Sequence, residues 1–184
     1  MAGQLSDSSI LSSIIRCVNF AAVKHKNQRR KDPEKTPYIN HPIGVAHILI
    51  EGGVEDPTVI QAALLHDTVE DTDTTNDELK EVFGSKVARI VAEVTDDKSL
   101  DKQERKKLQI VHAASSSPEA KLVKLADKLY NLRDLDRITP EGWSEERVEE
   151  YFSWAAKVVA GCRGTNAYIE LELDKLFKKR NVSI

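Results

Sequence analysis

Apolar residues recur at steps of three and four along most of the chain. The first such stretch spans residues 10–22, where the apolar positions fall on one face of a helix. The same period returns in later segments, whereas the charged segment at residues 98–111 fits either a helix or a mobile connector. The expected helices cover residues 10–22, 43–50, 57–66, 75–84, 87–94, 119–135, 144–160 and 166–179. We therefore predict an all-α fold of about eight to ten helices.

Helix-start residues and turns separate these stretches. Asp56, which is followed by a proline, and Thr75 both have side chains that cap a helix N-terminus. No run of alternating strand residues is found, so at most a small hairpin is expected near residues 30–38. We expect residues 1–184 to form a single domain in which residues 1–8 are flexible.

Composition narrows the class of protein. The net charge of -3 argues against a nucleic-acid partner, although a local basic cluster could bind a small phosphorylated ligand. Cys17 and Cys162 lie far apart and suit a reducing compartment. Because no apolar run is long enough to cross a bilayer and no signal is found, we expect a cytoplasmic protein without a membrane partner. The oligomeric state stays open.

One segment changes abruptly from apolar to ligand-bearing. The apolar helix that begins at residue 57 runs into His66 and Asp67, and Glu70 and Asp71 follow four positions after each. On a continuous helix these side chains would stack over one another. Crowded carboxylates repel, and a divalent cation would offset that repulsion. The alternative is a helix end that emerges into solvent, although acidic residues there oppose the helix dipole.

Two further residues could complete a metal site. His41 lies just before an expected helix, where a capping or core histidine is the alternative. Asp127 flanks an apolar helical stripe, where pairing with Lys124 or Arg133 is the alternative. With His66 and Asp67 they would supply two imidazoles and two carboxylates, a set that suits Mn²⁺, Fe²⁺ or Zn²⁺ better than Ca²⁺ or Mg²⁺.

Four blocks of sequence carry a family resemblance. They cover residues 29–42, 63–72, 83–95 and 121–133, in that order. With these blocks, the chain resembles the HD-superfamily hydrolase domain of RelA/SpoT-type proteins, which degrade the alarmone ppGpp. It is most similar to the small stand-alone metazoan SpoT-type members of that family. The resemblance extends over nearly the whole chain from about residue 20.

The resemblance implies a role for each candidate residue. One Mn²⁺ would be held by His41, His66, Asp67 and Asp127. Glu70 and Asp71 would handle the water and the proton transfers, since a carboxylate can orient or deprotonate a water that a cation has made more acidic. The implied substrate contacts are Arg30, Lys31 and Tyr38, with Asn131 near the ribose and Arg147 toward the phosphate end.

The implied reaction removes the 3′-pyrophosphate of ppGpp to give GDP and pyrophosphate. Removal of the 2′-phosphate of NADPH, which gives NADH, is an alternative in the same site. A non-catalytic nucleotide-binding module is a second alternative. Two features depart from the bacterial pattern, the longer loop at residues 31–37 and the acidic pair Asp96-Asp97, and their roles stay open. No synthetase or regulatory domain is expected, so we predict hydrolysis without synthesis.

Overall fold

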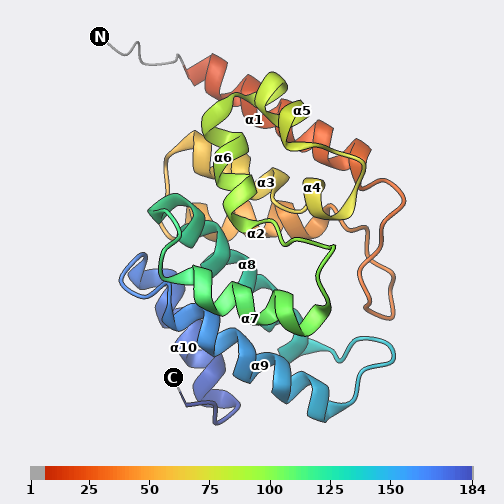
Figure 1. Ribbon diagram of the computed structural model, residues 1–184, viewed down its shortest axis with the longest axis vertical. Coiled ribbons are helices and arrows are strands. Elements are labelled where there is room, and N and C mark those ends of the chain that lie inside the picture. Colours follow the sequence, from red (N-terminus) through yellow and green to blue (C-terminus); the bar gives the residue numbers. More distant parts are fainter. Residues whose placement is uncertain (1–6, 184) are drawn as a thin grey trace.

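Ten α-helices make up the computed structural model over residues 7–183, which are the residues that the structure describes (Figure 1). They are α1 (Asp7–Lys24), α2 (Asn40–Glu51), α3 (Pro57–Leu65), α4 (Thr68–Asp71), α5 (Asn76–Phe83), α6 (Ser85–Val94), α7 (Lys102–Ala113), α8 (Pro118–Arg137), α9 (Glu145–Ala160) and α10 (Ala167–Lys179). Within this range the strand pairing consists of one antiparallel bridge between Arg29 and Pro37. The predicted all-α class is confirmed, and the small hairpin is reduced to that bridge.

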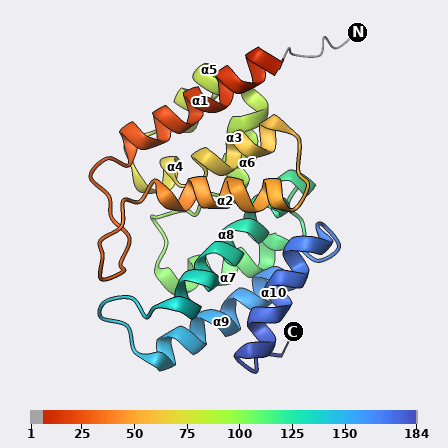
Figure 2. The ribbon, with the colours of Figure 1, turned by 180° about the vertical axis from the view of Figure 1, so that it is seen from behind.

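Helix α3 lies at the centre of the fold because most of its residues are apolar and buried. It packs against α1, α2, α6 and α8. Helices α2 and α8 also pack on each other, and Figure 2 shows them side by side between the α1 end of the molecule and the α9–α10 end. The buried residues of α3 are Val59, Ile60, Ala62, Ala63, Leu64 and Leu65. This packing brings the start of α2, the end of α3 and the middle of α8 into one place.

The expected helix starts are confirmed by their capping bonds. The Asp56 side chain accepts a hydrogen bond from Thr58 N, and the Thr75 side chain accepts one from Glu78 N. The charged segment at residues 98–111, left open between helix and connector, contains the start of α7, whose first turn is capped by Asp101. These bonds satisfy amide groups that have no partner inside the helix.

The expected continuous helix through the His66-Asp67 segment is wrong. Helix α3 ends at Leu65, and the short helix α4 begins at Thr68 after a turn. The Thr68 hydroxyl donates to Leu65 O over 2.7 Å, and His66 Nδ1 contacts Ala63 O at 2.7 Å. Side chains that bond nearby carbonyls in this way compete with the helical ladder. As a result His66 and Asp67 lie on a turn between two helices and not on a helix face.

The structure also bears on the cysteines, on membrane-spanning helices and on the N-terminal residues. Cys17 and Cys162 are both buried, and neither forms a disulfide bond within the described residues. Among residues 7–183, no helix is long and apolar enough to cross a membrane. The flexibility expected at residues 1–8 concerns mainly residues 1–6, which lie outside the described range, while residues 7 and 8 begin α1.

Candidate functional site

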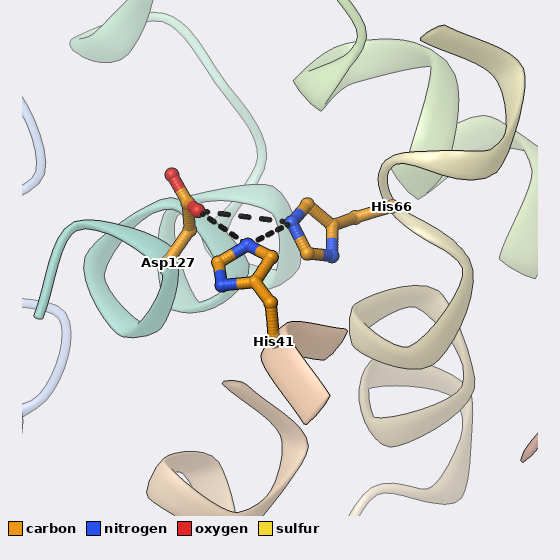
Figure 3. A group of neighbouring side chains, drawn as sticks. All are labelled: His41, His66 and Asp127. Atoms are coloured by element: carbon orange, nitrogen blue, oxygen red, sulfur yellow. Dashed lines mark hydrogen bonds and ion pairs between the residues drawn. The ribbon is translucent and has the colours of Figure 1, made fainter. Parts of the chain in front are cut away.

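Three side chains from separate parts of the chain converge on one buried point (Figure 3). His41 comes from the first turn of α2, His66 from the turn that follows α3, and Asp127 from the middle of α8. His41 Nε2 lies 3.2 Å from His66 Nε2 and 3.1 Å from Asp127 Oδ1, and His66 Nε2 lies 3.7 Å from the same oxygen. Ligand atoms of all three residues are within 4.8 Å of one another. Such a cluster of two nitrogens and an oxygen can hold a transition-metal ion.

Asp67, the fourth predicted ligand, joins the cluster from the turn after α3. Its Oδ2 lies 3.4 Å from His41 Nε2 and 3.1 Å from His66 Nε2. The residues present fit a divalent cation, because His66 Nδ1 is engaged by a backbone carbonyl and its Nε2 faces the carboxylates. Two imidazole nitrogens 3.2 Å apart between two carboxylates also require a positive charge between them, either a proton or a cation.

The electrostatics of the cluster agree with this interpretation. Burial opposes charge on His66, but the neighbouring carboxylates of Asp67 and Asp127 outweigh it and raise the His66 pKa well above its ordinary value. Burial likewise opposes charge on the two carboxyls. The histidines nevertheless hold the Asp67 pKa well below its usual range, and Lys128 together with the histidines does the same for the Asp127 pKa. The carboxylates are therefore ionised at neutral pH and available to bind a cation.

The Asp127 carboxylate is fixed on both sides. Asn131 Nδ2 donates to Oδ1 over 2.7 Å, and Lys128 Nζ donates to Oδ2 over 2.7 Å. Lys128 is buried against the ring of Trp154, 4.9 Å from its centroid. Asp127 is therefore paired with Lys128, and not with Lys124 or Arg133 as the alternative interpretation proposed. Contacts of this kind fix the orientation of a carboxylate that could bind a metal.

Tyr38 contacts a predicted metal ligand directly. Its hydroxyl donates to Asp67 Oδ2 over 2.6 Å, and burial next to this carboxylate raises the tyrosine pKa. The resemblance implied a substrate contact for Tyr38, and the residue also lines the larger cavity described below. The hydroxyl, however, is occupied by Asp67, so we expect it to act mainly through the metal centre.

Tyr38→Phe should therefore weaken metal binding while leaving substrate affinity nearly intact. Loss of the hydrogen bond to Asp67 should raise the Mn²⁺ dissociation constant about tenfold, as for other outer contacts of metal ligands. Titration of metal-free protein with Mn²⁺ measures this, and Tyr168→Phe on the partly exposed Tyr168 of α10 is the matched control. An unchanged dissociation constant with a raised KM would instead make Tyr38 a substrate contact.

Glu70 and Asp71 occupy different positions. Glu70 lines the same cavity of about 180 Å³ as the four predicted ligands. Burial, together with the charges of Asp96, Asp67 and Asp71, raises the Glu70 pKa to about 7, although the Asp96 amide donates to its Oε2 over 3.2 Å. A carboxylate with this pKa can accept a proton near neutral pH. The alternative of a helix end that emerges into solvent does not hold for Glu70, whose side chain is 21% exposed.

Asp71 faces the neighbouring cavities. Its carboxylate accepts hydrogen bonds from Gln28 Nε2 over 2.8 Å and from Lys98 Nζ over 2.5 Å. The Lys98 contact connects Asp71 to the residue that follows Asp96-Asp97, the acidic pair that differs from the bacterial pattern. The Asp96 carboxylate accepts a hydrogen bond from Gln109 Nε2, and the Asp96 backbone amide donates one to the Glu70 carboxylate. The Asp97 carboxylate accepts a hydrogen bond from the backbone amide of Ser99. Asp96 therefore supports Glu70.

A larger cavity of about 430 Å³ adjoins the metal cluster and contains four of the predicted substrate residues. These are Arg30, Lys31, Tyr38 and Asn131. Arg30 is fixed in place, because Nη2 donates to Asn131 Oδ1 and to Asp134 Oδ2, each over 2.9 Å. Since Asn131 also donates to Asp127, a chain of hydrogen bonds connects this arginine to the metal cluster.

The loop at residues 31–37 forms one rim of this cavity. Lys31 O accepts a hydrogen bond from Glu141 N over 2.9 Å, and Asp32 Oδ1 accepts one from Thr36 N. These bonds hold the loop against the turn between α8 and α9, on which Pro140 and Trp143 also line the cavity. The longer loop therefore helps to close the predicted substrate pocket.

Arg147 lies apart from the other predicted substrate residues, in a second cavity of about 560 Å³ that Lys31 also lines. Its guanidinium stacks on Trp143 at 4.1 Å from the ring centroid. Reasoning from the sequence missed three basic residues of this cavity, Lys102, Arg105 and Lys106, although their three- and four-residue spacing on α7 is a signal that could have found them.

Tyr151 was also missed as a site residue. It lines the cavity of the metal cluster and both larger cavities, so it lies where the three meet. The sequence carries no local signal for this role, because Tyr151 looks like one more apolar position of its helix.

Comparisons with known proteins identify this arrangement. The HD domain family matches residues 17–155, which is most of the chain. The chain belongs to the HD domain family. It is 67% identical over 172 residues to the guanosine-3′,5′-bis(diphosphate) 3′-pyrophosphohydrolase MESH1 of Danio rerio, covering 93% of this chain and 96% of that protein. The Homo sapiens protein of the same name is 65% identical over 174 residues, covering 94% and 97%.

A solved structure shares the fold of this HD domain. It is described as a metazoan ortholog of SpoT that hydrolyzes ppGpp and plays a role in starvation responses. The two structures match with a TM-score of 0.92 at 54% sequence identity, covering 99% of this chain and 100% of that one. The resemblance inferred from the four sequence blocks is thereby confirmed, and this chain is an HD hydrolase with a site suited to a divalent metal.

Proposed function

We propose that this protein is a Mn²⁺-dependent (p)ppGpp 3′-pyrophosphohydrolase. The observation that carries the proposal is the convergence of His41, His66, Asp67 and Asp127 on one cavity, with Glu70 in its wall. A basic, aromatic-lined cavity of about 430 Å³ adjoins it and suits a phosphorylated nucleoside. Relatives that bear the name 3′-pyrophosphohydrolase support the substrate.

The reaction is a hydrolysis at the 3′-phosphorus of ppGpp. The oxygen of water forms a bond to that phosphorus, the bond from phosphorus to the 3′-oxygen breaks, and pyrophosphate leaves. When bound, a divalent cation would make water more acidic and offset charge on the phosphoryl oxygens. Glu70, with a pKa of about 7, would take the proton from water, and Asp71 would take part in returning a proton to the 3′-oxygen. GDP and pyrophosphate are the products.

The substrate residues divide between the two larger cavities. Arg30 and Asn131 would hold the nucleoside beside the metal cluster, because they line the smaller of the two and are bonded to each other. Lys31 lines both cavities, and Arg147 would meet the distal phosphates. Guanidinium and ammonium groups favour phosphate oxygens, so this division draws in a polyanion despite the negative net charge of the chain.

Product analysis tests this function. Protein freed of metal by a chelator and reloaded with Mn²⁺ should convert ppGpp into equal amounts of GDP and pyrophosphate. Parallel reloading with Zn²⁺, Fe²⁺ and Mg²⁺ tests the metal, because two imidazoles with two carboxylates suit several transition ions. If Mn²⁺ binds and no phosphorylated nucleotide is cleaved, the chain is a nucleotide-binding module and the proposal fails.

NADPH is a second candidate substrate. The observation that favours it is the second cavity, which shares the lining residues Lys31, Trp143 and Tyr151 with the first and offers room for the other half of a dinucleotide. The oxygen of water would form a bond to the 2′-phosphorus, the bond from phosphorus to the 2′-oxygen would break, and the products would be NADH and phosphate. Release of phosphate from NADPH, measured beside release of pyrophosphate from ppGpp, compares the two substrates on one preparation.

Arg147→Gln should raise KM while changing kcat little. Loss of a charge-assisted contact to phosphate removes about 1.5 to 3 kcal/mol of binding, which corresponds to at least about a tenfold rise in KM. Arg163→Gln is the control, because Arg163 lies in the turn after α9 and pairs with Asp174 of α10. Equal effects of both substitutions on KM would contradict a phosphate contact at Arg147.

We further propose that residues 1–184 act as one HD hydrolase domain in the cytoplasm, with a small nucleotide as partner and no nucleic acid or membrane. Two buried free thiols and a net charge of -3 support this assignment. Microscopy of the tagged chain tests its location in the cell.

A further inference from the structure

The two histidines of the metal cluster are held in different ways. His66 Nδ1 contacts the carbonyl of Ala63 at 2.7 Å. His41 Nδ1 is buried and has no hydrogen-bond partner anywhere in residues 7–183. Metal-binding histidines usually donate the second ring nitrogen to an acceptor, which fixes the plane of the ring. No hydrogen bond at this second nitrogen therefore fixes the plane of the His41 ring.

Aromatic rings surround His41 instead. The ring centroid of Tyr130 is 4.9 Å away at an interplanar angle of 72°, and that of Tyr38 is 5.6 Å away at 62°. The His66 ring lies 5.1 Å away. Edge-to-face geometry of this kind is the arrangement that ring quadrupoles favour, and it restricts rotation of the imidazole. Tyr130, from α8, is the closest of the three rings.

Gly44 explains how Tyr130 reaches this position. Gly44 follows His41 by three residues on α2, so both lie on the helix face that meets α8. A Cβ at position 44 would lie 2.0 Å from Tyr130 Cε2 and 2.5 Å from Cδ2. The tyrosine ring therefore occupies the space that any other side chain would fill. Glycine inside a helix is less favourable than alanine, so its presence here needs a reason in packing.

We propose that Gly44 and Tyr130 are positioning residues that hold the imidazole of His41 in the orientation that binds the metal. The inference rests on the proposed metal centre. The Tyr130 ring also makes a cation–π contact with Arg30, whose guanidinium carbon lies 5.6 Å from the ring centroid. One ring thus links a metal ligand to a substrate-binding arginine, and a displaced ring disturbs both.

Gly44→Ala tests the proposal through the affinity for Mn²⁺. The added methyl group must push the Tyr130 ring, so the Mn²⁺ dissociation constant should rise about 10- to 100-fold, the usual effect of disturbing the surroundings of a metal ligand. Electron paramagnetic resonance of free Mn²⁺ in titrations of metal-free protein gives this constant without any substrate. Once the protein is saturated with Mn²⁺, KM should also rise, through Arg30.

Gly161→Ala provides a matched steric control. A Cβ at position 161 would lie 2.6 Å from Ala113 Cβ, a comparable clash at the contact between the end of α9 and α7. This variant should lose thermal stability yet keep its Mn²⁺ dissociation constant within about threefold of wild type. If both glycine variants weaken Mn²⁺ equally, the effect is general destabilisation and the positioning role is wrong.

A double variant shows whether the methyl group acts through the ring. In a Tyr130→Ala background the space is empty, so adding Gly44→Ala should change the dissociation constant less than about twofold. Additive effects would overturn the proposal, as would wild-type affinity in Gly44→Ala. Should Gly44→Ala not fold, Tyr130→Leu must still weaken Mn²⁺ binding, and wild-type affinity there overturns the role. Failure of the wild-type protein to bind Mn²⁺ would refute the proposed metal centre instead.

Discussion

Asp127→Asn should abolish hydrolysis of ppGpp, with kcat reduced on the order of 1000-fold or more. The substitution keeps the shape of the side chain but removes the charge that faces His41 Nε2 at 3.1 Å. It should also remove measurable Mn²⁺ binding in the micromolar range. Steady-state assays with Mn²⁺ in excess and titrations of the metal-free protein measure the two effects separately.

The same substitution has a predictable cost in stability. Lys128 is buried and its ammonium group donates to Asp127 Oδ2 over 2.7 Å, so Asp127→Asn leaves a buried cation without a counter-ion. Breaking a buried pair on one side costs about 3 kcal/mol or more. Adding Lys128→Met should recover most of that stability and none of the activity. This double variant therefore separates the chemical role of Asp127 from its structural role.

Asp136→Asn is the matched control for Asp127→Asn. Asp136 is on the same helix, and its side chain is 18% exposed, close to the 16% of Asp127. It pairs with Lys179 and Arg180 near the C-terminal end of α8. Its replacement should leave kcat and Mn²⁺ binding unchanged. Normal turnover in Asp127→Asn would refute the metal assignment, whatever happens to stability.

The helices of this fold could be predicted from the sequence because the information is local. Apolar steps of three and four residues and capping side chains such as Asp56 and Thr75 act within one or two turns. The break at His66 was not predictable from the same signals. It depends on bonds from the His66 and Thr68 side chains to carbonyls three residues earlier, and the apolar period continues through it without a change.

The metal cluster could be anticipated more fully than the substrate pocket. His41, His66, Asp67 and Asp127 are unusual residues for their local positions, and the family resemblance placed all four in one shell. Tyr151 and the basic face of α7 are ordinary residues for amphipathic helices. They become site residues only because α7, α8 and α9 pack together around the cavities. The spacing of the basic residues on α7 marks one face of that helix, but it does not show that this face lines a cavity.

Glu70→Gln should reduce kcat by about 100- to 10,000-fold while sparing Mn²⁺ binding. Glutamine keeps an oxygen that can accept from the Asp96 amide, but it cannot take a proton from water. Glu70 lines the metal cavity without contributing to the cluster of ligand atoms, so the Mn²⁺ dissociation constant should stay within about threefold of wild type. Loss of Mn²⁺ binding would mean that Glu70 is a ligand and not a base.

The raised pKa of Glu70 makes a second, independent prediction in the metal-free protein. Burial raises the pKa from 4.5 to about 7, so the folded state resists ionisation of this carboxyl. Wild type should therefore lose stability relative to Glu70→Gln as pH rises from about 4.5 to about 7, and the difference should then stay constant. Allowing for partial exposure, it should reach on the order of 2 kcal/mol in favour of glutamine. Denaturant unfolding at pH 4.5, 6 and 8 with chelator present measures it.

Glu172→Gln should show the opposite sign and so serves as the matched control. Glu172 is 22% exposed, close to the 21% of Glu70, but hydrogen bonds from Lys175 and Arg133 lower its pKa. Its ionised form stabilises the fold above the unfolded pKa, and that contribution is lost as pH falls through the folded pKa. Glutamine should thus destabilise at neutral pH here, where at position 70 it stabilises. A catalytic role for Glu70 would explain why an acidic residue stands at a position where its ionised form lowers the stability of the fold.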